Sequence, residues 1–193
     1  MFFQTQFEIG ILNAWIFTVF YFLFSFLPII FRKKKSKKTR KISSFSPTDN
    51  VEDAAGKVIY WLSFIIFILT MIVSIFLPII FGISFYIGLI IYILGIIFVG
   101  LTITSWMNTP EDKVIKIGIY KYSRNPMYIS MFLTHMGISI VTISWVFFLL
   151  TIIYSILTIM IVFFEEKACI QRFGESYKNY MRETSRWLGN TKK

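Results

Sequence analysis

The chain has little charge, one cysteine and one histidine. Only 16% of its 193 residues are charged, whereas 56% are hydrophobic. This balance excludes an ordinary soluble domain of this size. The lone Cys169 cannot form a disulfide within the chain, and the lone His135 argues against a histidine-based metal site, so we expect no metal. What the chain has in abundance is apolar residues, including 22 phenylalanines.

The apolar runs are long enough to cross a membrane. About 20 helical residues span the roughly 30 Å of hydrocarbon in a bilayer, at 1.5 Å per residue. We therefore predict an all-α fold, an integral membrane helical bundle of about five transmembrane helices. The predicted spans are 9–31, 58–80, 83–106, 127–144 and 145–164. The first is expected to be an anchor rather than a cleaved signal peptide, because it is too long and lacks a basic start.

The segment after the last span has the pattern of an amphipathic helix. Apolar residues recur there at spacings of three and four, which predicts a cytoplasmic C-terminal helix over 165–183. The repeating positions are Ile170, Phe173, Tyr177 and Tyr180. Gly174 is expected to interrupt this helix. It could lie on the inner membrane surface or cover a site as a lid, and the two roles are compatible.

The basic residues are confined to one side of the predicted bundle. All 20 lysines and arginines fall in 32–57, 107–126 and the C-terminal tail. By the positive-inside rule these segments are cytoplasmic, with the N-terminus outside and the C-terminus inside the cell membrane. The run Arg32–Lys41 has no interleaved aromatic residues, so we expect it to face anionic lipid headgroups rather than nucleic acid.

Two polar clusters flank the last pair of spans. The tract Gly118–Tyr128 (GIYKYSRNPMY) precedes them and the doublet Glu165–Glu166 follows them. The two spans are about 27 and 30 Å long, so a hairpin returns the doublet to the depth of Arg124. We predict that both clusters wall one pocket at the membrane surface. A plain ion pair between Arg124 and the carboxylates is the alternative.

The side chains of the tract suit a ligand with an aromatic ring, hydroxyls and charges. Tyr120, Tyr122 and Tyr128 can stack on a heterocycle and offer hydroxyls. Asn125 can both donate and accept hydrogen bonds, and Gly118 lets the backbone approach a ligand closely. Together with the two carboxylates, these properties fit S-adenosylmethionine, which combines adenine, ribose, a zwitterionic amino acid and a sulfonium.

The order of these motifs resembles a known enzyme family. The tract, the hydrophobic hairpin, the doublet Glu165–Glu166 and the stretch Phe173–Tyr180 (FGESYKNY) are similar to the isoprenylcysteine carboxyl methyltransferase family, which includes related phospholipid methyltransferases. The resemblance covers about residues 105–190. It implies an integral membrane enzyme that takes S-adenosylmethionine from the cytosol and methylates a lipid-linked acceptor.

The resemblance also assigns roles to particular residues. The residues that fall where the family binds its cofactor are Tyr120, Asn125, Pro126, Met127, Tyr128 and Glu165. Val114 and Ile115 fall in a connector that approaches the cofactor by its backbone. Arg124 and Glu166 lie beside these positions, and we assign them to catalysis.

The chain departs from the family pattern at two positions. The family often has Arg-His-Pro where this chain has Asn125 in the middle position, and asparagine cannot titrate near neutral pH. The eukaryotic prenylcysteine enzymes have an arginine about one turn before the glutamate, where this chain has Ile161. The first change removes any proton role at that position, and the second argues against a prenylcysteine substrate.

We thus expect two parts and one leading function. Residues 1–57 would form an anchor helix and a basic loop, and 58–193 a methyltransferase-like core with its cofactor pocket in 107–180. The acceptor would be a lipid, an isoprenoid or a lipidated molecule. An NADPH-dependent membrane sterol or lipid reductase and a non-enzymatic membrane interaction protein are the alternatives. The oligomeric state is left open.

Overall fold

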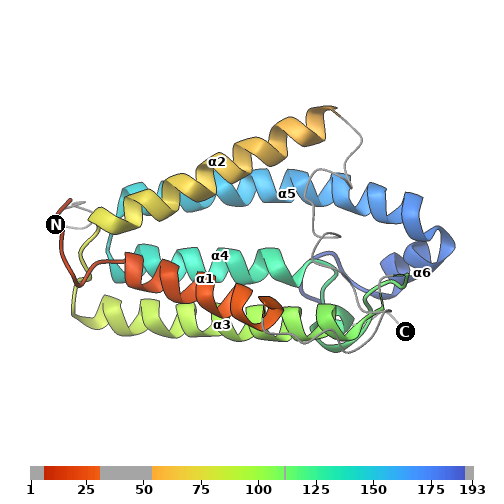
Figure 1. Ribbon diagram of the computed structural model, residues 1–193, viewed down its shortest axis with the longest axis horizontal. Helices are drawn as coiled ribbons and strands as arrows, with labels where there is room; N and C mark the ends of the chain where they lie inside the picture. The colour runs from red at the N-terminus through yellow and green to blue at the C-terminus, as the bar shows by residue number, and fades with distance from the viewer. Residues whose placement is uncertain (1–6, 31–53, 111, 190–193) are drawn as a thin grey trace.

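The computed structural model describes residues 7–30, 54–110 and 112–189, and these form a helical bundle (Figure 1). The helices are α1 (Trp15–Ile30), α2 (Ala54–Phe76), α3 (Ile83–Asn108), α4 (Pro126–Val141), α5 (Trp145–Phe173) and α6 (Glu175–Glu183), with a short 3-10 helix η2 (Gly118–Lys121) before α4. The β-structure of the described residues is one isolated bridge, between Asn13 and Pro78. The all-α prediction is therefore confirmed for this part of the chain.

Three of the helices are long and apolar enough to cross a bilayer. These are α2, α3 and α5, with 23, 26 and 29 residues. Helices α1 and α4 are apolar but have 16 residues each, about 24 Å at 1.5 Å per residue. A membrane-spanning protein is supported, whereas the count of five spans stays a prediction. The basic run 32–41 lies outside the described residues.

Several predicted helix ends differ from the observed ones: α2 ends at Phe76 instead of residue 80, α3 at Asn108 instead of 106 and α4 at Val141 instead of 144. Two further differences have a local cause. The first helix begins at Trp15 instead of residue 9, because the Asn13 amide donates to the carbonyls of Glu8 and Ile75 at 2.6 and 2.7 Å and holds the preceding segment against the end of α2. Helix α5 does not stop at residue 164. It continues to Gly174, whose φ of 54° ends it.

The prediction of one amphipathic helix over 165–183 is accordingly wrong in its bounds. Its first half is the extension of α5, and its second half is α6, which begins after Gly174. Gly174 was expected to interrupt the helix, and it does. On α6 the two predicted apolar positions Tyr177 and Tyr180 are both buried.

A tight turn joins α4 to α5 and makes them a hairpin. Ser144 caps α5 by accepting the N–H of Phe147 at 3.2 Å, as a serine before a helix commonly does. Ile143 precedes it with a φ of 48°. The boundary predicted between residues 144 and 145 is confirmed, and the hairpin returns the end of α5 to the start of α4 (Figure 1).

Helices α3 and α4 pack closely because glycines face one another across their interface. A Cβ added to Gly137 would lie 2.7 Å from the carbonyl oxygen of Gly88 and 2.7 Å from the backbone of Tyr92. A Cβ on Gly95 would lie 2.8 Å from the backbone N of Thr134. Small residues allow backbones to approach in this way in membrane bundles. Gly88 and Gly95 therefore serve the close packing of α3 against α4.

Gly137→Ala should therefore destabilise the bundle. Its methyl group has no room unless α3 and α4 separate, and overpacking of this kind costs about 1–3 kcal/mol. Thermal unfolding in detergent, followed by tryptophan fluorescence, would show a lower midpoint. Gly82→Ala is the matched control, because Gly82 is exposed with open space around its Cβ position and an extended φ of 167°. Equal midpoints for the two variants would contradict the packing argument.

The only histidine has its hydrogen-bond partner inside the bundle. His135 is buried on α4 and its Nδ1 donates to the carbonyl of Met131 at 2.7 Å. Its ring stacks on that of Tyr154, with centroids 5.4 Å apart. These contacts account for His135 as part of the core.

Candidate functional site

The predicted site residues gather at one end of the bundle. Helix η2, the start of α4, the charged end of α5 and α6 all lie at the right-hand end in Figure 1. They are brought there by the α4–α5 hairpin and by Gly174, which turns the chain back after α5. The end of α3 lies against η2, and the tail after α6 is joined to the tract by backbone hydrogen bonds.

Helix η2 is fixed on α3 by a close contact at Gly118. This glycine has a φ of 59°, a region that other residues rarely adopt, and an added Cβ would collide with the hydroxyl of Ser105 on α3. We expected Gly118 to let a ligand approach the backbone. Its closest approach in the structure is to Ser105, so its role in the observed fold is to seat the tract against α3.

Glu166 is the centre of a buried ion-pair cluster. Its side chain is 5% exposed, with Oε1 3.0 Å from Nη2 of Arg124 and Oε2 2.8 Å from Nη2 of Arg186. The Asn125 amide also donates to Oε1, at 3.4 Å. The predicted meeting of Arg124 with the acidic doublet is thus confirmed at Glu166. Hydrogen bonds between charged groups are the stronger kind, and here they tie the start of α4 to α5.

Glu165 points to a different partner. The hydroxyl of Tyr128, on the first turn of α4, donates to Oε1 of Glu165 at 2.7 Å. The neighbouring carboxylates therefore divide between two environments, because successive residues of a helix face different directions. One carboxylate is held by a phenol and the other by two guanidinium groups.

The tail after α6 closes over the tract. We call the segment Thr184–Gly189 the tail strap. The backbone N–H of Arg124 donates to the carbonyl of Ser185 at 3.0 Å, and the Asn125 side chain donates to the carbonyl of Arg186 at 3.2 Å. These bonds hold the strap and the tract side by side, which positions the guanidinium of Arg186 beside Glu166.

Helix α6 adds a second link to the tract. The hydroxyl of Tyr180 donates to the carbonyl of Tyr120 at 2.7 Å. Burial raises the pKa of the Tyr180 phenol well above its usual range, so that the group stays protonated and remains a donor. The ammonium of Lys116, in the connector before η2, lies 5.8 Å from the centre of the Tyr180 ring. The orientation of η2 thus depends on α6 as well as on α3.

The other predicted site residues occupy different surroundings. Pro126 is the first residue of α4, where its missing N–H costs nothing. Met127 packs against the hydrophobic core, so its side chain is not part of the polar cluster. Val114 and Ile115 are half-buried in the irregular connector between α3 and η2.

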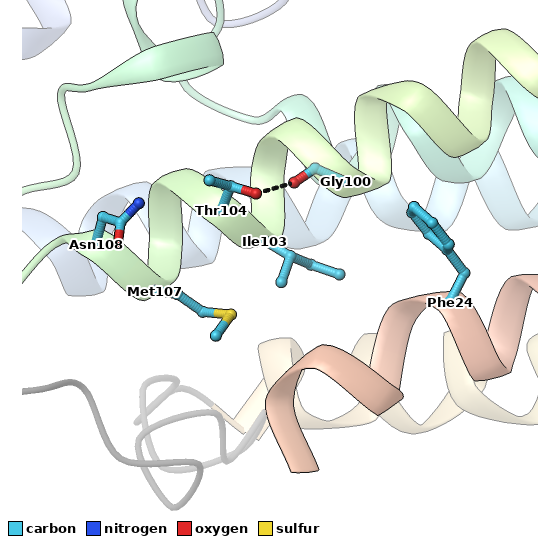
Figure 2. Close-up of a pocket in the computed structure, with 6 residues that line it drawn as sticks. All are labelled: Phe24, Gly100, Ile103, Thr104, Met107 and Asn108. Carbon is cyan, nitrogen blue, oxygen red and sulfur yellow. Dashed lines mark hydrogen bonds between the residues drawn. The ribbon is translucent and has the colours of Figure 1, made fainter. Parts of the chain in front are cut away.

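A separate cavity of about 280 Å³ lies between α1 and α3. Figure 2 shows it between Phe24 of α1 and the residues Gly100, Ile103, Thr104, Met107 and Asn108 of α3. None of these residues is among the predicted site residues, although Met107 and Asn108 fall at the start of the range 107–180 predicted for the pocket. The predicted polar residues instead contact one another directly, through the hydrogen bonds and ion pairs given above.

Sequence reasoning missed the most important contribution of the tail. Arg186 was counted only as one of the basic residues on the predicted inner side, whereas it pairs with Glu166 and shares the cluster with Arg124. The pattern alone does not say which of the seven tail cations reaches back.

Comparison with known protein families gives one match. The family model described as phospholipid methyltransferase matches residues 77–176. The match begins between α2 and α3, earlier than the resemblance noted from the sequence, and it ends within α6, before the tail strap. It contains the tract, Glu165 and Glu166. A search of curated proteins finds no match.

Proposed function

Because this chain belongs to the phospholipid methyltransferase family, whose model matches half of its length, we propose that it is an S-adenosylmethionine-dependent methyltransferase acting on a lipid, isoprenoid or lipidated acceptor at the cytoplasmic membrane face. Family membership supports methyl transfer as the class of reaction and the apolar helices support a membrane setting. The cofactor, the acceptor class and the orientation are the finer parts of the proposal.

One observation carries the site assignment. The α4–α5 hairpin brings Tyr128 to 2.7 Å from Glu165 and Arg124 to 3.0 Å from Glu166 at one end of the bundle. A soluble cofactor and a membrane-bound acceptor can meet only near such an end, where apolar helices reach the water. The charged side chains of the matched residues 77–176 are concentrated at this end.

The donors and acceptors at this end fit S-adenosylmethionine. Among the described residues, Nε of Arg124 is one of two buried side-chain polar atoms without a hydrogen-bond partner, and an orphaned guanidinium donor suits a ligand carboxylate. The carboxylate of Glu165 suits the ammonium or the hydroxyls of the same ligand. Tyr120 and Tyr128 would supply ring faces and Asn125 an amide, with Val114 and Ile115 offering backbone groups from the connector.

These residues would mainly bind the cofactor and align its methyl group with the acceptor. S-adenosylmethionine supplies an activated methyl group, so the protein needs no nucleophile of its own. Tyr128 orients Glu165, and Arg124 and Glu166 fix the start of α4 relative to α5. For an amine acceptor a proton must leave. Glu165 is the better candidate to receive it, because Glu166 is already held by two guanidinium groups.

The family match also bears on the two alternatives. It favours methyl transfer over an NADPH-dependent reductase and over a non-enzymatic membrane protein. Calorimetric binding on detergent-solubilised protein separates all three: we expect S-adenosylhomocysteine to bind and NADPH to give no heat. Labelled-methyl transfer to total lipids and to small prenylated thiols would then identify the acceptor. Binding of NADPH alone would overturn the proposal.

A further inference from the structure

Helix α2 ends just before the matched residues 77–176, so the family match assigns it no role. Its buried residues recur at spacings of seven and four, namely Gly56, Ser63, Thr70 and Ser74. Tyr60 lies four residues after Gly56 on the same face and is half-buried. Positions four and seven apart share one side of a helix, so Tyr60 is directed into the bundle.

A layer of three rings fixes the position of α2 relative to α4 and α5. The Phe67 ring on α2 has its centroid 6.1 Å from that of His135 on α4 and 6.1 Å from that of Tyr154 on α5. The His135 and Tyr154 rings are 5.4 Å apart, so the three helices meet at this level. Oγ1 of Thr70, one turn further along α2, lies 3.4 Å from Nε2 of His135. We call the three rings the middle layer.

Two tyrosines lie at the same distance from the middle layer, on the side of the polar cluster. Tyr60 precedes Phe67 by seven residues on α2, and Tyr128 precedes His135 by seven residues on α4. Helices α2 and α4 run in the same direction, away from the end that holds the cluster (Figure 1). Seven residues make nearly two full turns and rise about 10 Å. Tyr60 and Tyr128 are therefore at one level and on the faces that the middle layer brings together.

Glu165 reaches this level from α5. It follows Tyr154 by eleven residues, close to three turns, so the two residues share a face of α5. Oε1 of Glu165 accepts from the Tyr128 hydroxyl at 2.7 Å. Tyr60 is near enough to interact electrostatically with both Glu165 and Tyr128. The helix register and these interactions agree in placing phenols from two helices about one carboxylate. We call Tyr60, Tyr128 and Glu165 the polar layer.

We infer that Tyr60 is a further binding residue of the proposed cofactor site, through which α2 supplies the third side of that site. A phenol can donate to and accept from ligand hydroxyls, and its ring face suits a ligand cation. A ligand whose ammonium or hydroxyls contact Glu165 lies within reach of Tyr60. The site then extends beyond 107–180, the range predicted for the pocket, to the helix that precedes the matched residues.

This inference rests on the proposed function, because the ligand that it places beside Tyr60 is the cofactor. The polar layer itself can be tested without any ligand. The experiments therefore take the two questions separately, first the surroundings of Tyr60 and then its contribution to binding.

The first experiment is fluorine NMR on the full-length protein in detergent. All ten tyrosines are labelled with 3-fluorotyrosine, and the line that disappears in Tyr60→Phe identifies Tyr60. We expect Glu165→Gln to shift the Tyr60 line, because it removes a charge from the polar layer. Glu175→Gln is the matched control, because it removes a carboxylate from the exposed face of α6 and should leave the line in place. A Tyr60 line that does not move in Glu165→Gln would overturn the inference.

The second experiment measures the affinity for S-adenosylhomocysteine by calorimetry. Tyr60→Phe keeps the ring and its packing but removes the hydroxyl, and we expect the affinity to fall about 2- to 10-fold, as for one lost hydrogen bond. Tyr86→Phe is the control, since it loses the same group from a residue 66% exposed on α3 and should bind as the wild type does. A hydroxyl with only a structural role would lower the thermal midpoint of Tyr60→Phe and leave its affinity unchanged, and that result would overturn the inference.

Failure of this inference and failure of the proposed function give different results. If the wild-type protein and Tyr60→Phe bind S-adenosylhomocysteine equally well, the methyltransferase proposal stands and the assignment of Tyr60 is wrong. If the wild-type protein does not bind S-adenosylhomocysteine while the Tyr60 line still depends on Glu165, the polar layer stands and the cofactor assignment is wrong.

Discussion

Glu165→Gln should lower the affinity for S-adenosylhomocysteine by about 10- to 100-fold, because a hydrogen bond to a charged group contributes about 1.5–3 kcal/mol. The amide has the shape of the carboxylate and still accepts from Tyr128, so the fold should be retained. What disappears is the negative charge that the ligand's ammonium or hydroxyls would contact. Titration calorimetry of the purified variant measures the loss directly.

Tyr128→Ala tests the same site from α4. It removes the ring and the hydroxyl that donates to Glu165 at 2.7 Å, so that both stacking and the orientation of the carboxylate are lost. We expect no measurable cofactor binding. Tyr122→Phe is the control, because Tyr122 belongs to the same tract but is 55% exposed. Unchanged affinity in Glu165→Gln and Tyr128→Ala would remove the site assignment, whatever the stability of the variants.

The meeting of the two polar clusters could be predicted because it follows from length and charge. Two apolar spans of nearly equal length must return the chain to the same depth, and the charges at 124 and 165–166 mark that depth. The observed contacts of Arg124 and Tyr128 with the acidic doublet follow from this simple geometry. Gly88 and Gly95 fall in the apolar run 83–106, and small residues at such positions indicate close helix packing.

The features that were not predicted depend on contacts between residues that are distant in the sequence. No local pattern shows that Gly118 fits against Ser105, or that the strap lies along the tract through backbone bonds to Ser185 and Arg186. The end of α5 was misplaced for a different reason. Charged residues at 165–167 mark the end of the hydrocarbon, whereas a helix continues until its backbone is interrupted, here at Gly174.

The position of Arg186 shows what a charge count omits. Counting by segment put it correctly with the other tail cations, because topology depends on the sum of charges. Its contact with Glu166 depends on the turn at Gly174, on α6 and on the strap, because the direction of each segment sets the position of the one that follows it. Inserting or deleting one residue in any of these segments would bring a different side chain to the cluster.

Glu166→Gln should destabilise the protein more than any other single change in the cluster. It leaves the guanidiniums of Arg124 and Arg186 close together without the carboxylate that lies 3.0 and 2.8 Å from them. Removing one partner from a buried ion pair costs about 3–5 kcal/mol, because the remaining charge is uncompensated. The loss would appear as a lower free energy of unfolding in a denaturant titration of detergent-solubilised protein.

The size of this effect depends on the repulsion between the two arginines, which a second substitution can isolate. In the double variant Glu166→Gln with Arg186→Gln, one of the unpaired charges is gone and part of the stability should return. Glu175→Gln is the matched control: its carboxylate pairs with Lys178 at 2.7 Å on the exposed face of α6, where a surface ion pair contributes about 0–1 kcal/mol. If Glu166→Gln cost no more than Glu175→Gln, the cluster would not be what joins α4, α5 and the strap.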